Sequence, residues 1–143
     1  MRLSTRTRYG LRAMASVARH GGEFATSELL AASEGLSKKY LDAILGQLRE
    51  AGLLEAARGQ HGGYRLTRPA EEITAADVVD VLDGGIAMAP CLEDASRCAR
   101  APRCPTRPVW RAASKAMREA LAGLTLADLA SRQLETAEAT YAI

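Results

Sequence analysis

Apolar residues recur at the three- and four-residue spacing of an amphipathic helix over most of the chain. Ser4 is suited to cap a first helix that runs to His20, in which Tyr9, Ala13 and Val17 supply one apolar face. A second helix is predicted from residue 26 or 27 to 35, and a third follows within a few residues and reaches about residue 52. The first third of the chain is therefore predicted to be helical.

The third predicted helix, capped by Ser37, separates apolar from polar positions. Its apolar residues follow the i, i+3, i+4, i+7 rule and form one buried stripe: Leu41, Ile44, Leu45 and Leu48. Its exposed faces are polar: Lys38, Lys39, Asp42 and Arg49. A short helix, a tight turn containing glycine and a longer helix with a polar face form the helix-turn-helix pattern of DNA-binding proteins. Many other helical proteins also contain such a pair.

Two short predicted strands follow this helix. Residues 53–57 and 64–67 have strand-like composition and enclose the glycine-rich, basic turn 58–63. A hairpin placed directly after a recognition-type helix is the wing of a winged helix, and its glycines let the backbone approach phosphates. A flexible surface turn is the alternative interpretation of the same glycines.

A fourth helix is predicted to begin at the capping box of Thr74 and Asp77 and to end at the glycine pair 84–85, completing the core of one domain. From there to Pro108 no periodicity is evident, and all three cysteines lie in this segment. Loops of this length are uncommon in compact domains unless they are functional or disordered.

A long helix is predicted after Pro108, with a seam in alternating steps of three and four residues: Trp110, Ala113, Met117, Leu121 and Leu124. Because the first four helices already complete a core, this seam predicts a homodimer interface in preference to internal packing.

Thr125 and Asp128 are predicted to cap one more short helix, and the tail from Glu135 to Ile143 is predicted to be frayed. The chain thus divides into a winged helix-turn-helix DNA-binding domain (1–83), a cysteine-containing loop (84–108), and a dimerisation helix with a C-terminal tail (109–143).

Composition agrees with a mainly α fold. The 143 residues are 48% apolar, enough for one ordinary core, while only 4% are aromatic and alanine and leucine are frequent. No run approaches the ~18 apolar residues of a membrane helix, and the N-terminal residues lack the apolar stretch of a secretory signal. We therefore expect a cytoplasmic protein with no membrane partner.

The three cysteines, Cys91, Cys98 and Cys104, have the spacing C-x6-C-x5-C. A reducing cytosol disfavours disulfides, and this spacing is wider than the paired C-x-x-C motifs of structural zinc sites. Thiolates suit an iron-sulfur cluster, which spans more space than one ion. Four arginines lie among and just after the cysteines: Arg97, Arg100, Arg103 and Arg107. Nearby cations lower thiol pKa values, which favours a cluster but equally suits reactive thiols without a metal.

The chain resembles the IscR/NsrR group of bacterial winged-helix regulators over nearly its whole length. The features that carry the resemblance occur in order: Met1-Arg2-Leu3 with Arg8-Tyr9, the run from Leu36 to Leu41, the wing Arg58-Gly59-x-x-Gly62-Gly63-Tyr64, and three loop cysteines before Trp110. The resemblance implies an iron-sulfur cluster, of the 2Fe–2S or 4Fe–4S type, held by the three cysteines, and a homodimer formed by the long late helix.

The resemblance also implies contacts to a double-stranded DNA operator. Lys38, Lys39 and Asp42 fall on recognition-helix positions, and Arg58 falls on the wing, with His61 and Gly62 beside it. Lysine can bind phosphate or guanine, arginine can form a bidentate contact or enter a narrow minor groove, and a carboxylate can accept from cytosine.

The fourth cluster ligand of the group varies, and this chain departs from both known patterns. Arg107 stands where one branch has a histidine, and Arg8 stands where another branch has an acidic residue from the partner subunit. Arginine stays protonated and is a very poor ligand. His20 lies at a helix end and His61 in the wing. The remaining candidates in the loop are Glu93, Asp94 and Thr106, and the alternative is an open site filled by water or a small thiol.

The sequence therefore predicts a DNA-binding transcription regulator, acting as a repressor, whose operator affinity depends on an iron-sulfur cluster that senses cluster status, oxygen or nitric oxide. The alternative is a cluster-free regulator switched by cysteine oxidation. An enzyme with a nucleophilic cysteine is disfavoured, because no histidine lies near the cysteines in sequence and no phosphate-binding glycine motif follows a strand.

Overall fold

The computed structural model describes residues 3–141, so the first two residues of the N-terminal motif and the last two of the predicted tail lie outside it. The helices are α1 (Thr5–Ala18), α2 (Ser27–Glu34), α3 (Lys38–Glu50), α4 (Ala75–Asp83), α5 (Pro90–Glu93), α6 (Arg107–Ala122) and α7 (Leu126–Tyr141). Three 3-10 turns accompany them: η1 (Ala70–Glu72), η2 (Ala95–Arg97) and η3 (Ala101–Arg103). The strands β1 (Leu54–Ala57) and β2 (Gly63–Leu66) form an antiparallel pair. The predicted mainly α fold with a two-stranded wing is confirmed.

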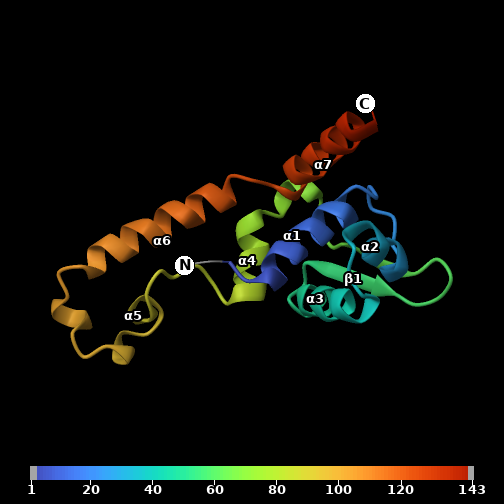
Figure 1. Cartoon of the computed structure of the whole chain (residues 1–143). Helices are drawn as coiled ribbons and strands as arrows, with labels where there is room; N and C mark the ends of the chain where they lie inside the picture. The colour runs from blue at the N-terminus through green and yellow to red at the C-terminus, as the bar shows by residue number, and fades with distance from the viewer. Residues whose placement is uncertain (1–2, 142–143) are drawn as a thin grey trace.

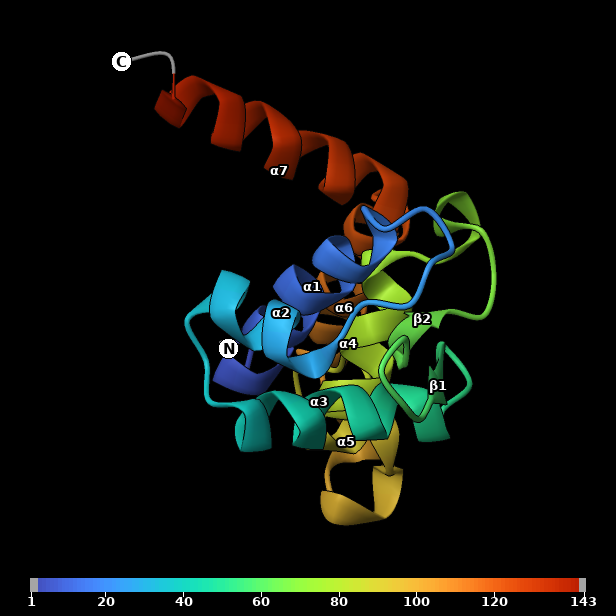
Figure 2. The same cartoon turned by 90° about the vertical axis from the view of Figure 1, so that its right-hand side faces the viewer.

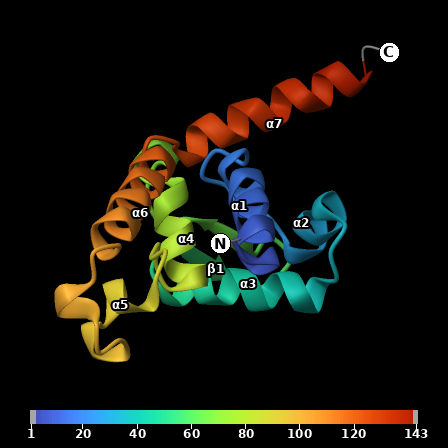
Figure 3. The ribbon, with the colours of Figure 1, turned by 60° about the vertical axis from the view of Figure 1, so that its left-hand side comes forward.

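Helices α1 to α4 enclose the hydrophobic core, with α3 lying across one side of the bundle (Figure 3). The predicted stripe of α3 is fully buried, and Met14 and Val17 of α1 and Val78 of α4 pack in the same cluster. Within the described residues, no helix is long and apolar enough to cross a membrane.

Polar caps fix the starts of the core helices. The side chains of Ser4, Thr26 and Ser37 each accept a hydrogen bond from a backbone N–H in the first turn of α1, α2 and α3. Thr74 and Asp77 form a reciprocal capping box at α4. These caps satisfy N–H groups that the helix itself leaves unpaired, so the predicted helix starts are confirmed to within a residue or two.

The wing is fastened to the loop between α1 and α2. Tyr64 and Ala25 exchange two backbone hydrogen bonds, each 2.9 Å long. Gly63 has a φ of +132°, and a Cβ atom there would collide with the Ala25 carbonyl. Only glycine allows the strand to approach this closely, so the base of the wing is held by three segments of chain.

Helix α6 projects from the bundle and buries none of its residues (Figure 1). Its C-terminal end is anchored beside the start of α4, because Ala75 N donates to Leu124 O and Leu126 N donates to Ile73 O, both at 2.8 Å.

The prediction for the C-terminal segment is wrong in one respect. The helix after Thr125 is not short, and the tail does not fray at Glu135, because α7 continues for 16 residues to Tyr141 (Figure 2). The Thr125–Asp128 cap is present, with Asp128 N donating to Thr125 Oγ1 at 3.2 Å. Leu126 and Ala130 are buried, so packing on α1 stabilises the helix beyond what its own sequence pattern indicates.

Candidate DNA-binding and sensor sites

A groove of about 310 Å³ separates α3 from the wing. Lys38, Asp42 and Arg49 line it from α3, and Arg58 and Tyr64 line it from the wing. Three cationic side chains therefore face one cleft between the two elements that contact DNA in winged-helix proteins.

Asp42 is the centre of a hydrogen-bond network in this groove. Its carboxylate accepts from Ser27 Oγ at 2.6 Å, from Lys38 Nζ at 2.8 Å and from Tyr64 OH at 3.4 Å. These donors come from α2, α3 and β2, and the Asp42 side chain remains 32% exposed. The network fixes the orientation of the carboxylate while leaving part of it accessible.

The same contacts shift the pKa values of Asp42, Lys38 and Tyr64. Partial burial alone would raise the pKa of Asp42, but hydrogen bonds from Lys38 and Ser27 outweigh it and hold that pKa below its usual value. The hydrogen bond to Asp42 raises the pKa of Lys38. Burial, and then the charge of Asp42, raise the pKa of Tyr64. At neutral pH the network therefore consists of a carboxylate, an ammonium group and a neutral phenol.

The other predicted DNA contacts lie around this groove. Lys39 is exposed on the first turn of α3, and Arg58 and His61 are exposed on the turn of the wing. Gly62 is buried, and its N–H donates to Gly59 O at 3.1 Å. A side chain at Gly62 would collide with the Ala57 carbonyl, so this glycine shapes the turn.

Sequence reasoning missed two partners of Asp42, namely Ser27 and Tyr64. The sequence indicates Ser27 only as a possible helix start, and Tyr64 only as a strand residue and a member of the wing motif that carries the resemblance. No spacing pattern connects them, because they approach Asp42 from other elements only after the chain has folded.

The cysteine loop is built of short turns. Cys91 lies in α5, Cys98 follows η2 and Cys104 follows η3, and all three are partly buried free thiols. Among the described residues, no three side chains of His, Cys, Asp or Glu are gathered so as to hold a metal ion. The three thiols have the right donor chemistry for an iron-sulfur cluster, which spans more space than a single metal ion.

The positions of the variable fourth ligand have other contacts here. Arg107 Nη2 donates to the Cys91 carbonyl at 3.1 Å, which links the start of α6 to α5. Arg8 Nη2 donates to Thr5 Oγ1 at 3.1 Å on exposed α1 surface. Among the remaining candidates, Asp94 accepts hydrogen bonds from Ser96.

Cys104 has a distinctive environment. Thr106 Oγ1 lies 3.2 Å from Cys104 Sγ. This hydroxyl, followed by the Thr106 backbone N–H, holds the pKa of the Cys104 thiol below its ordinary value. A lower pKa increases the thiolate fraction, and the thiolate is the form that binds metals and reacts with oxidants.

The predicted dimer seam lies along α6, and its two ends differ. Trp110 is 40% exposed near the N-terminal end. Leu121 and Leu124 instead line an apolar groove of about 570 Å³, together with Leu11 of α1 and Leu129 of α7.

Comparisons with known proteins place this architecture in a family. The family model Rrf2, described as an iron-dependent transcriptional regulator, matches residues 3–132. Protein rrf2 of Nitratidesulfovibrio vulgaris is 42% identical over 130 residues, which span 90% of this chain and 87% of that protein.

Two solved structures agree with this assignment. The HTH-type transcriptional regulator CymR of Bacillus subtilis is 39% identical over 132 residues, which span 92% of this chain and 91% of that protein. Its solved structure is similar to this one with a TM-score of 0.76, and the match covers 92% of this chain and 98% of the CymR chain. The structure of T. potens IscR is similar at a TM-score of 0.75 with 31% identity, covering 95% of this chain and 90% of its own. The chain belongs to the Rrf2 family of helix-turn-helix transcription regulators.

Proposed function

We propose that this regulator is a homodimeric repressor that reads its operator with α3 in the major groove and the wing alongside. The observation that carries the proposal is the groove between α3 and the wing, where Lys38, Arg49 and Arg58 converge. Phosphate contacts by such cations supply most of the non-specific affinity for DNA, and contacts to base edges supply sequence preference.

The residues in and around this groove take different roles. Lys39 and Arg58 are exposed and contact phosphate or base edges, while His61 and Gly62 bring the wing backbone close to the DNA. Asp42, oriented by Ser27 and Tyr64, is suited to accept a hydrogen bond from a cytosine amino group. Lys38 already contacts Asp42, so it binds DNA as part of this pair.

DNA titrations at several salt concentrations test the interface. Lys39→Ala and Arg58→Ala are each expected to weaken binding and, if the residue contacts phosphate, to reduce the salt slope by about one. Arg132→Ala removes an equal charge from exposed α7 and is the matched control. Unchanged affinity and slope in both test variants would contradict the assigned interface.

For the sensor, we propose that an iron-sulfur cluster held by Cys91, Cys98 and Cys104 controls operator affinity. The description of the family as iron-dependent and the presence of three thiols in one loop support this proposal. The three thiolates would be the protein ligands, in the segment that precedes α6.

The second candidate is direct oxidation of the cysteines. The lowered pKa of the Cys104 thiol favours it, because the thiolate is the form that reacts with oxidants. The solved structure of CymR, a global cysteine regulator, is among the structures that this chain resembles.

Spectroscopy on protein purified without oxygen separates the two sensors. Visible absorption with bound iron and sulfide, lost when Cys91, Cys98 or Cys104 is replaced by serine, is expected for the cluster. A colourless, iron-free protein whose DNA affinity changes on treatment with peroxide would instead establish the thiol switch. If none of these substitutions alters either cluster content or the response of DNA affinity, both sensor proposals are wrong.

A further inference from the structure

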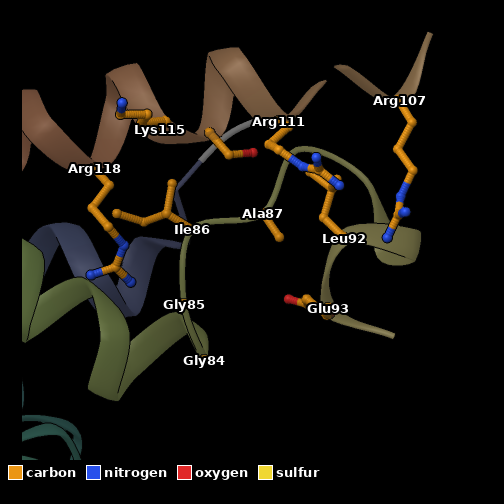
Figure 4. Close-up of a pocket in the computed structure, with 11 residues that line it drawn as sticks. Gly84, Gly85, Ile86, Ala87, Leu92, Glu93, Arg107, Arg111, Lys115 and Arg118 are labelled. Atoms are coloured by element: carbon orange, nitrogen blue, oxygen red, sulfur yellow. The ribbon is translucent and has the colours of Figure 1, made fainter. Parts of the chain in front are cut away.

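A further pocket, distinct from the two grooves described above, lies between α6 and the segment from Gly84 to Glu93, with a volume of about 400 Å³ (Figure 4). It is found at the α6 end of the molecule, away from the wing (Figure 1). The DNA-binding groove does not include it, since the two have no lining residue in common.

Cationic side chains occupy one face of α6 at this pocket. They are Arg107, Arg111, Lys115 and Arg118, which follow one another in steps of three and four residues and so share a helix face. Arg107 and Arg111 reach from α6 toward Leu92 on the opposite wall, and Arg118 reaches toward α4 (Figure 4).

Internal carboxylates neutralise part of this charge, and Lys115 Nζ lies 3.7 Å from Glu119 Oε1 on the same helix. Arg118 forms two hydrogen bonds to Asp80, at 2.9 and 2.6 Å. Glu93 is the one carboxylate among the described lining residues, and it lies 3.8 Å from Arg97. Arg111 has no carboxylate within ion-pair distance among residues 3–137.

Arg107 also has an unused donor. Its Nη2 binds the Cys91 carbonyl, but its Nε is buried without a hydrogen-bond acceptor in the described part of the chain. An unpaired buried donor is costly, and such groups in native proteins normally have a partner. Arg111, in contrast, is exposed and lines the pocket, where an oxyanion can reach its guanidinium group.

We propose that this pocket binds a small multivalent anion that carries carboxylate or phosphate groups, with Arg107, Arg111 and Lys115 as its ligands. The planar guanidinium groups can form bidentate hydrogen bonds to either kind of oxyanion, and the lysine adds a point charge. Ile86 and Leu92 provide an apolar wall. The volume lies in the range of pockets that hold metabolites of modest size.

The site joins two parts of the molecule. One wall belongs to the segment that leads to Cys91, and the other belongs to α6. A bound anion therefore ties the cysteine-bearing segment to the helix that carries the predicted dimer seam. Any effect of the anion on DNA affinity rests on the proposed function, whereas the binding itself does not.

Calorimetry on the full-length chain tests the site with citrate and pyrophosphate, titrated at constant ionic strength. One saturable site per chain is expected for at least one of them, and the preferred anion distinguishes carboxylate from phosphate recognition. Arg111→Gln and Lys115→Gln should each weaken binding about tenfold, because each removes a charged hydrogen-bond donor. Arg132→Gln, with the same loss of charge on α7, should bind like the unsubstituted chain.

Three outcomes would overturn the proposal: no saturable binding of either anion, equal binding by the pocket variants, or an equal loss in Arg132→Gln. Arg111 and Lys115 are exposed, so their replacement leaves the core intact, and a thermal melt checks this. Because the titration contains no DNA, its failure would leave the proposed regulatory function untouched.

Discussion

Two carboxylates hold separate elements together. Asp42 does so at the DNA-binding groove, beside the first residue of α2, and Glu34 does so as the last residue of α2. Arg12 Nε lies 2.8 Å from Glu34 Oε2, Ser16 Oγ donates to Glu34 Oε1 at 2.8 Å, and Gln133 Nε2 donates to it at 3.4 Å. This contact joins α1, α2 and α7, and the Glu34 side chain is only 1% exposed.

Replacing Glu34 tests this junction. Glu34→Ala leaves the Ser16 hydroxyl with a weaker set of partners and removes the ion pair to Arg12, so it should lower the free energy of unfolding by about 1–3 kcal/mol. Urea denaturation measures the change. Glu50→Ala, an exposed position at the end of α3, is the control and should alter stability by at most about 0.5 kcal/mol. If both substitutions changed the free energy of unfolding equally, the contacts of Glu34 would not contribute to stability.

Thr106→Val tests the cause of the lowered pKa of Cys104. Loss of the hydroxyl should raise the pKa of the thiol, so less thiolate is present at neutral pH and alkylation of Cys104 by iodoacetamide slows several-fold. The difference should vanish at a pH above both thiol pKa values, where the thiol is ionised in both proteins. Mass spectrometry follows each cysteine separately.

Cys91 in the same chain is the internal control, and Thr106→Ser should restore the rate because it keeps the hydroxyl. If Cys104 were alkylated at the same rate in the Thr106→Val variant and in the unsubstituted protein, the Thr106 hydroxyl would not be the cause of the lowered pKa.

At the residue scale, sequence identified groups whose chemistry is local. Ser37 caps α3 as expected, because a helix cap depends only on the next few residues. The partners of Asp42 and Glu34 could not be found in this way. Gln133 reaches Glu34 across almost the whole chain, and the contact exists only when α7 packs on α1.

At the scale of elements, glycines set how closely helices approach. Gly10 lies where α1 crosses α4, and a Cβ atom there would collide with the end of the Leu82 side chain. Gly46 on α3 has open space around it. A side chain at Gly10 would therefore meet a neighbouring residue, whereas a side chain at Gly46 would not.

Alanine substitutions distinguish them. Gly46→Ala should raise the free energy of unfolding by about 0.5–1 kcal/mol, because it improves helix propensity without a clash. Gly10→Ala gains the same propensity, but its Cβ must displace the end of the flexible Leu82 side chain, so it should stabilise less than Gly46→Ala. Thermal or urea unfolding measures the free energy of unfolding of both variants, and an equal gain in the two would contradict the close α1–α4 packing.

The elements that sequence predicted well have a strong internal period. The stripe of α3 is an example, because an amphipathic helix must bury its one apolar face. The length of α7 was missed because Leu126 and Ala130 gain their burial from α1, a contact that no local pattern encodes. The cysteine segment shows no hydrophobic periodicity. Its short helical turns depend on a proline in the first turn of α5 and of η3, and on the Asp94 cap of η2.

At the scale of the whole molecule, α6 stands apart from the bundle with Trp110 and Val109 exposed (Figure 1). Sequence could indicate this seam but not the shape of an interface, which depends on a second copy. The arrangement of the three thiols is similarly beyond the reach of spacing alone, because it depends on how the loop folds around whatever it binds.

Trp110→Glu tests the proposed dimer. A charge in an apolar interface should shift the protein from dimer to monomer and weaken operator binding, because one protomer then holds only one half-site. Sedimentation velocity measures the assembly. Ala112→Glu places the same charge on an exposed position of α6 away from the seam and should remain dimeric. A dimeric Trp110→Glu protein would place the interface elsewhere.

The anchoring of α6 has a mechanical consequence. Its C-terminal end is held beside the start of α4 by the hydrogen bonds of Leu124 and Leu126, while its N-terminal end is attached to the rest of the chain through the cysteine segment. Arg118 is paired with Asp80 of α4, and Ser114 Oγ accepts a hydrogen bond from Met88 N, so the middle of the helix is held as well. With 16 residues the helix is about 24 Å long, so a tilt of about 10° about its C-terminal end carries the far end through about 4 Å. In the proposed dimer, a change of a few ångströms around the thiols would therefore reach the partner subunit as a rotation of α6.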